Sequence, residues 1–328
     1  MRARRRFLLG ALVVLVLGAA QTAVAAIPLL EDIEAMYARE GPSRRTWVRE
    51  LLGDIKAKEA SGAPVSGMSL GQLISVLDSE GEADAVRDPA RALRKVELGL
   101  QAAQEWRSRF ENWTTIVLKT EGSLYMTRWF LRGDPEDRKV ALAKYGASDD
   151  AESRAEWRGS GRYFLGAKYQ TLASWARETG RPRNEQIALI DAGIAANKAG
   201  REKYQFDSII GLNLLYGGLN YVSGESALGT RLDEWQAYMR TQPRADQARS
   251  GAMLAEALFQ FERDDEALPW FDLYAAYWAI EPVKPEMRES ELQTRCLRDL
   301  RGDGFRAYAR REPARFAAMR DRRCAGKP

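Results

Sequence analysis

One short stretch of this chain, Gly67-Met68-Ser69-Leu70-Gly71, matches the G-x-S-x-G pattern of a serine nucleophile. That pattern needs a strand ahead of the serine and a histidine to activate its hydroxyl, and the chain contains no histidine. The same absence excludes imidazole bases and the usual zinc ligand sets. We therefore interpret Ser69 as the cap of a helix rather than as a catalytic group.

Carboxylates are the catalytic groups that remain, because hydrolysis of a glycan needs only two well-placed Asp or Glu side chains. With 46 acidic residues, the sequence singles out no pair. The densest acidic run, Asp78 to Asp84, lacks the ligand spacing of an EF-hand loop. We expect it to be a solvated loop ahead of a helix that Asp88 caps. No catalytic residue, metal site or cofactor is predicted.

Aromatic residues at helical spacing form the best candidate for a binding surface. Trp270, Tyr274 and Trp278 follow one another at i, i+4 and i+8, so they share one face of a helix. Tryptophan and tyrosine stack on sugar rings and anchor protein partners. Ordinary packing between helices is the alternative interpretation. The complete predicted surface comprises Tyr169, Tyr216, Trp235, Trp270, Tyr274 and Trp278.

The elements that must position these residues are helices, because apolar residues recur at helical spacing almost everywhere and strand patterns are nearly absent. Asp88-Pro89 and Asp134-Pro135 each place a capping side chain before a proline that suits the first helical position. The fold class is therefore predicted to be all-α. Helices are expected near 28–40, 43–59, 69–79, 89–111, 113–131, 135–145, 149–179, 184–199, 201–221, 226–240, 244–261, 264–280, 285–301, 304–311 and 314–323.

Between residues 163 and 282 the predicted helical hairpins look repetitive. In the last of them, Leu254, Ala255 and Leu258 precede a turn, and Ala267 and Phe271 follow it. This pattern resembles tetratricopeptide-type repeats, in which small residues at fixed places let two helices approach closely. The resemblance implies a right-handed α-solenoid whose concave surface binds a partner. The spacing between hairpins exceeds the period of about 34 residues of that family, so a nonrepetitive helical bundle and an α/α toroid remain alternatives.

The first residues have the three parts of a secretory signal peptide. Arg2, Arg4, Arg5 and Arg6 precede an apolar run that begins at Phe7 and leads to Ala23-Val24-Ala25. We expect cleavage after Ala25, which leaves equal numbers of basic and acidic residues. The alternative is an uncleaved inner-membrane anchor formed by residues 7–30, which carry no charge. High arginine and alanine content suggests a bacterial source, so the expected location is the periplasm.

Two cysteines, Cys296 and Cys324, lie in the last 33 residues. In an exported chain such a pair favours a disulfide, which would stabilise the fold by roughly 3–4 kcal/mol; two free thiols are the alternative. Residues 286–328 hold 12 basic and 7 acidic residues and are expected to form a solvated, arginine-rich end. The predicted organisation is a signal peptide (1–25), a helical region (26–147), repeat-like hairpins (148–283) and this basic segment (284–328).

These observations favour an exported envelope protein that binds another envelope protein or a cell-wall component as a scaffold or assembly factor. The alternatives are an α-helical enzyme that cleaves a polysaccharide through two carboxylates, and a protein that binds a small apolar ligand between helices. Nucleic acid is not an expected partner of an exported protein, and a membrane is expected only if the N-terminal segment stays uncleaved.

Overall fold

All secondary structure in the described part of the chain is helical, which confirms the predicted all-α class. The structure is a computed structural model that describes Ile27 and residues 29–41, 46–110, 113–205, 209–280 and 300–325; the side chains of residues 278–280 and 323–325 are not described. Within these residues, no helix combines the length and the apolarity that crossing a bilayer requires.

The chain divides into two compact units, unit 1 up to Ala141 and unit 2 from Leu142 onward. This division falls six residues before the end of the predicted N-terminal region. Helix α7 (Pro135–Ala151) runs across the division. The loop expected at 146–150 is therefore helical.

Unit 1 is built around one apolar core. Its largest buried side chains include Trp106, Ile33 and Ile55, and α4 packs against both α5 and α6. Ile27 and Leu30, which close the uncharged N-terminal stretch, are buried in the same core. Its helices are α2 (Leu30–Glu40), α3 (Trp47–Ala60), α4 (Gly67–Asp84), α5 (Pro89–Glu105), η1 (Arg107–Arg109), α6 (Thr114–Arg132) and the first part of α7.

The start and the end of α4 both differ from the sequence prediction. Ser66 rather than Ser69 is the N-cap, and its hydroxyl accepts a hydrogen bond of 3.2 Å from the backbone N–H of Ser69. The helix then continues through the acidic run to Asp84. The prediction of a solvated acidic loop was wrong, whereas the Asp88 cap of α5 is confirmed by a 2.9 Å bond from the N–H of Arg91.

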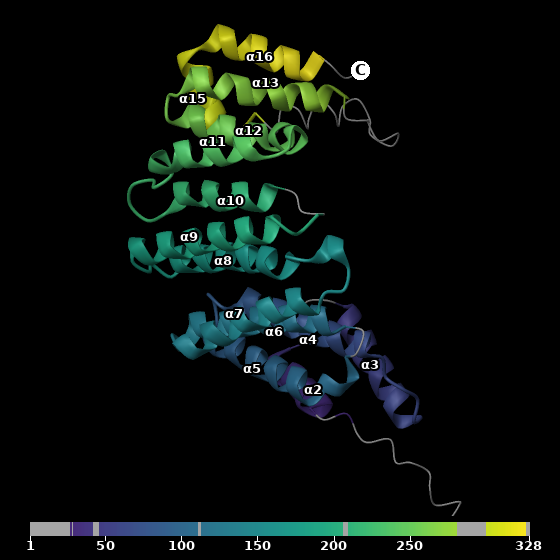
Figure 1. The fold of residues 1–328 in the computed structure, drawn as a ribbon. Helices are drawn as coiled ribbons and strands as arrows, with labels where there is room; N and C mark the ends of the chain where they lie inside the picture. Colours follow the sequence, from purple (N-terminus) through teal and green to yellow (C-terminus); the bar gives the residue numbers. More distant parts are fainter. Residues whose placement is uncertain are drawn as a thin grey trace, which may run out of the picture. The chain divides into compact units, whose positions relative to one another are not determined.

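Unit 2 is a stack of helices that follow one another roughly in chain order (Figure 1). The most extensive contacts join α8 to α9 and α12 to α13, while α10 packs on α8, α9 and α12. Beyond α7, its helices are η2 (Ala155–Trp157), α8 (Ser160–Glu178), α9 (Arg183–Arg201), α10 (Ile210–Gly218), η3 (Leu219–Tyr221), η4 (Gly229–Arg231), α11 (Leu232–Thr241), α12 (Arg244–Gln260), α13 (Asp264–Ile280), α15 (Asp303–Arg311) and α16 (Pro313–Ala325).

Small residues bring α12 and α13 close together. Ala255 and Ala267, two of the residues that carry the repeat resemblance, are fully buried. One turn before Ala255, a Cβ atom on Gly251 would overlap the carbonyl group of Trp270. The backbone of α13 therefore occupies the space that a side chain at position 251 would need.

Two arginines near the C-terminus pair with neighbouring helices, whereas the sequence predicted a solvated, arginine-rich end. Arg311 reaches Asp264 at 2.6 Å and donates to the carbonyl oxygen of Phe259 at 2.7 Å. Arg322 lies 3.5 Å from Asp272. The predicted disulfide, the signal peptide and the helix expected at 285–301 fall outside the described residues, because Cys296 and the side chain of Cys324 are not described.

Candidate binding site

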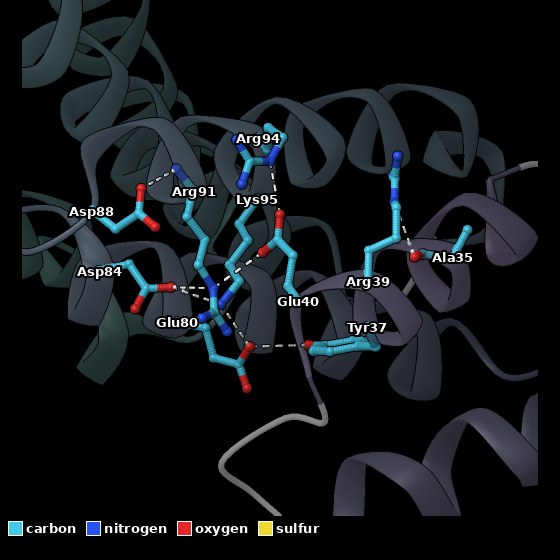
Figure 2. A network of polar contacts seen from close by, with 10 residues as sticks. All are labelled: Ala35, Tyr37, Arg39, Glu40, Glu80, Asp84, Asp88, Arg91, Arg94 and Lys95. Carbon is cyan, nitrogen blue, oxygen red and sulfur yellow. Dashed lines mark hydrogen bonds and ion pairs between the residues drawn. The ribbon is translucent and has the colours of Figure 1, made fainter.

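The densest polar cluster of unit 1 is a buried network of ion pairs (Figure 2). Lys95, only 2% exposed, lies 2.8 Å from Asp84 and 3.2 Å from Glu80. Arg91 joins Asp84 to Glu40 at 3.2 and 3.1 Å. The acidic residues at positions 80 and 84 are one turn apart on α4, so both face the lysine that α5 supplies.

The charges in this network cancel. Glu40, Glu80 and Asp84 face Arg91, Arg94 and Lys95, and Arg94 lies 2.7 Å from Glu40. The tyrosine hydroxyl of Tyr37 donates to Glu80 at 3.2 Å. No group of three or more candidate metal ligands occurs among the described residues. A balanced set of this kind, buried at Glu80, Asp84 and Lys95, fixes α2, α4 and α5 against one another, and we assign it a structural role.

Unit 1 also holds a cavity of about 220 Å³. Its walls are almost wholly apolar and include the exposed side chains of Trp47, Met68 and Ile116, with Gln72 and Ser75 as the polar contribution. Few polar groups are therefore available there to orient a ligand.

A larger cavity, of about 320 Å³, lies in unit 2 between α8, α10 and α12. Each helix contributes side chains about one turn apart. Helix α8 supplies Gln170, Ser174 and Arg177, α10 supplies Leu214 and Gly217, and α12 supplies Met253, Glu256 and Gln260. Tyr221 of η3 adds an aromatic ring to the lining.

An exposed apolar stripe along α10 and η3 leads to the mouth of this cavity. Ile210, Leu214 and Tyr221 are 43%, 42% and 59% exposed, and Leu214 and Tyr221 line the cavity. Ile210, Leu214 and Gly217 occur at i, i+4 and i+7 and therefore lie on one face of α10, and Tyr221 follows on η3. A Cβ on Gly217 would meet nothing within 4 Å. The glycine leaves open space where the stripe crosses the cavity.

Polar side chains form hydrogen bonds with one another at the entrance of the cavity. The amides of Asn220 and Gln260 hydrogen-bond to each other twice, at 3.1 and 2.9 Å, and Ser226 donates to Asn220 at 2.9 Å. The guanidinium carbon of Arg177 lies 5.5 Å from the ring centre of Tyr221. These contacts join η3, which follows α10, to α8 and α12 and keep the walls in place.

Of the predicted aromatic surface, Trp235 lies in this cavity. Its ring is 1% exposed and forms part of the floor. Its indole N–H donates to Asn213 at 2.8 Å, and Tyr216 stacks behind it at 5.2 Å. Tyr216 in turn donates to Glu234 at 2.6 Å. The two rings thus act as a rigid support rather than as an exposed surface.

The other predicted aromatic residues do not form one surface. Tyr169 and Trp270 are buried between helices, and the indole N–H of Trp270 donates to Gln236 at 3.3 Å. Tyr274 is half-buried beside Phe271. The side chain of Trp278 lies outside the described residues. The expected open surface is therefore not present at positions 169, 216, 235 and 270, because helix-to-helix packing covers these rings.

Glu256 has two roles in the wall of the cavity. Its carboxylate accepts hydrogen bonds from the backbone N–H groups of Asp303 and Gly304, and so caps α15, which has no cap of its own. Burial, together with the negative charge of Asp303, raises the pKa of Glu256 above the value of an exposed glutamate. Gly302 and Gly304 pack so tightly that a Cβ on either would overlap Glu256.

The sequence prediction missed Leu214, Gly217, Tyr221, Arg177 and Glu256. The one available signal was the spacing of Leu214 and Tyr221, which are seven residues apart with two glycines between them. In the continuous helix predicted over 201–221, these two apolar residues would lie on one face. Comparison of the chain with protein-family models, curated proteins and solved structures gives no match. The function must therefore be inferred from the residues of the site.

Proposed function

We propose that the protein is a binding module, and that the cavity between α8, α10 and α12 receives a segment of a partner polypeptide. The observation that carries this proposal is the exposed stripe along α10 and η3, which borders a cavity of about 320 Å³ and leaves Leu214 and Tyr221 uncovered. Exposed apolar side chains beside a cavity whose walls are both apolar and polar are typical of sites that bind a partner.

The arrangement of the three helices also supports this proposal. Helices α8, α10 and α12 come first in successive helix pairs, and α8 with α9 and α12 with α13 form the tightest of them. We infer a solenoid of the tetratricopeptide type in unit 2, with its binding surface on the first helices. The pair formed by α10 and α11 departs most from this pattern. Helix α10 makes its main contacts with α8, α9 and α12 rather than with α11.

We further propose that the protein works in the periplasm and that its partner is another envelope protein or a cell-wall component. The proposal rests on the basic and apolar start of the sequence. Burial of Ile27 and Leu30 in the core of unit 1 supports cleavage over an anchor that extends to residue 30, because buried side chains are not available to lipid.

The alternative of a polysaccharide-cleaving enzyme needs two carboxylates that face one another. Among the described residues that line the cavity, Glu256 is the one carboxylate and Arg177 the one cation. Since one carboxylate does not supply both the acid and the base or nucleophile, we propose binding rather than hydrolysis.

Filling the cavity should abolish binding without harm to the fold. In Gly217→Trp, the indole enters open space, so we expect the variant to fold as the wild type does. Gly53→Trp on α3 is the matched control, because a Cβ there also meets nothing within 4 Å and the position is exposed, in unit 1. The measurement is affinity capture from the envelope fraction, followed by calorimetry with each purified candidate partner.

The expected result is a partner that binds the wild type and Gly53→Trp and loses at least tenfold in affinity for Gly217→Trp. A partner that binds all three proteins equally would show that the cavity is not the binding site. Glycan hydrolysis by the wild type that Glu256→Gln abolishes would instead favour the enzyme.

A further inference from the structure

The walls of the cavity set a condition on the conformation of the segment that it receives. We propose that this segment binds as an amphipathic α-helix of about three turns, whose uncharged apolar face packs along the stripe formed by Ile210, Leu214 and Tyr221. This inference rests on the proposed function, since it names the kind of polypeptide segment that the cavity binds.

The first observation is that the walls offer little backbone to an extended segment. Such a segment brings an unpaired N–H and C=O group on almost every residue, and each of them needs a partner where it is buried. The three main walls are helices, whose backbone groups bond within the helix except at its ends. Among the residues that the structure describes there is no strand, and therefore no sheet edge to which a segment could add.

The second observation is that the polar side chains of the lining already bind one another. The amides of Asn220 and Gln260 form a closed pair, and the hydroxyl of Ser174 donates at 3.0 Å to a glutamate one turn later on α8. Gln186, only 1% exposed, uses its amide nitrogen in two bonds of 2.7 Å. Gln170 makes no hydrogen bond to another described residue, but one amide serves a single residue of an extended segment. A helix needs no such partners, because its backbone groups are already paired.

The third observation concerns charge complementarity. The stripe from Ile210 to Tyr221 contains no Asp, Glu, Lys or Arg. Among the described residues of the lining, the charged ones are Arg177, which lies over the ring of Tyr221, and Glu256, whose carboxylate accepts bonds from the backbone at the start of α15. A charge on the contacting face of the partner would lose water without gaining an ion pair. Apolar side chains there would instead cover Leu214 and Tyr221.

The dimensions of the stripe also suit a helix. Ile210 and Tyr221 are eleven residues apart in the chain, which corresponds to about 16 Å along a helix, or about three turns. A partner helix laid along α10 and η3 would present one apolar side chain per turn to this stripe. Between Leu214 and Tyr221, a Cβ on Gly217 meets nothing within 4 Å, so the gap has room for one large side chain of the partner.

The test uses three pools of acetylated and amidated twelve-residue peptides. In the first pool leucine stands at i, i+4, i+7 and i+11, the other positions vary, and a lactam bridge on the opposite face holds the helix. The second pool has the same leucines without the bridge and a central proline, which prevents the helix. In the third pool leucine alternates with polar residues, as in a strand. The full chain is immobilised, and retention of each pool is measured at equal concentration.

Two variants of the site and two controls accompany the wild type. Gly217→Trp fills the gap, and Gly53→Trp places the same side chain on α3. Leu214→Ala shortens the centre of the stripe, and Leu142→Ala on α7 is its matched control, because these two leucines are 42% and 41% exposed. Neither truncation removes a buried side chain, so we expect both variants to fold, and circular dichroism checks all four.

We expect the wild type and both controls to retain the bridged pool at least tenfold better than the proline pool. Leu214→Ala should lose about tenfold in retention of the bridged pool, and Gly217→Trp should retain none of the pools. Within the bridged pool, lysine or glutamate in place of the leucine at i+7 should each reduce retention by the wild type about tenfold.

Some results would overturn this inference and leave the proposed function intact. These are equal retention of the bridged and proline pools, or better retention of the alternating pool, in each case with loss in Gly217→Trp. Bridged peptides with lysine or glutamate that bind as well as those with leucine would overturn the uncharged contact face. Unchanged retention in Leu214→Ala would overturn the placement along the stripe.

Three further results would bear on the proposed function itself. If the wild type retains no pool better than Gly217→Trp does, the cavity does not bind polypeptide. If decanoate displaces the bridged pool at equal concentration, a hydrocarbon chain rather than a polypeptide is the ligand, and both proposals fail in their stated form. A wild-type dimer that Leu214→Ala dissociates would identify the occupant as a second copy of the chain, and would likewise overturn both.

Discussion

Lys95→Met should reduce the free energy of unfolding of unit 1 by about 3–5 kcal/mol, the largest effect that we expect from a single substitution. Lys95 is 2% exposed and lies within 3.2 Å of both Glu80 and Asp84. Without the lysine ammonium, the buried carboxylates of Glu80 and Asp84 lose the positive charge that both of them contact. Arg91 still contacts Asp84, whereas Glu80 keeps the hydroxyl of Tyr37. Urea denaturation measures the loss, and hydrogen exchange of the α4 and α5 amides localises it.

Two comparisons separate charge from packing. The triple variant Glu80→Gln, Asp84→Asn, Lys95→Met removes both carboxylates together with the lysine and should regain most of the lost stability. Lys139→Met breaks an exposed ion pair with Glu136 and should have little effect. If Lys95→Met were no more harmful than Lys139→Met, the network would not hold α4 and α5 together.

Gly251→Leu should be the second most damaging substitution, with a loss of about 3 kcal/mol in unit 2. A side chain at position 251 would overlap the carbonyl group of Trp270, so α12 and α13 would have to separate. That separation would also expose Ala255 and Ala267, which are fully buried on these two helices. Thermal unfolding followed by circular dichroism measures the effect.

Gly53→Leu on α3 provides the control for this prediction. It makes the same change inside a helix, but a Cβ there meets nothing within 4 Å. Because glycine is a poor helix former, this variant should be slightly more stable than the wild type, by roughly 0.5–1 kcal/mol. If Gly251→Leu behaved in the same way, α12 and α13 would not be as close as described.

Features that depend on neighbouring residues in the sequence were predictable. The helical class follows from apolar spacing, and the Asp88 cap follows from a single dipeptide. The acidic run was assigned to a solvated loop because nothing within it shows a partner. Its partner, Lys95, comes from the next helix, and only the packing of α5 on α4 turns Glu80 and Asp84 inward.

The candidate binding site was harder to predict for a physical reason. An aromatic stripe at helical spacing looks the same in a sequence whether it faces solvent or a neighbouring helix, and the packing of α11, α12 and α13 buries Trp235 and Trp270. The cavity depends in part on positions that lack a side chain, Gly217 and Gly218 of its lining. A glycine has no side chain, so its place in the sequence does not show whether the space beside it is an open cavity or is filled by a neighbouring helix.

The open space at Gly217 implies a conflict between stability and the proposed binding. Two adjacent glycines weaken the last turn of α10, by roughly 0.5–1 kcal/mol each relative to alanine. A side chain at 217 would meet no obstacle, so selection for heat resistance alone would readily replace this glycine. A laboratory evolution experiment that rewards only thermostability should therefore accumulate substitutions at position 217 and, with each larger side chain, weaken the binding that we propose for the cavity.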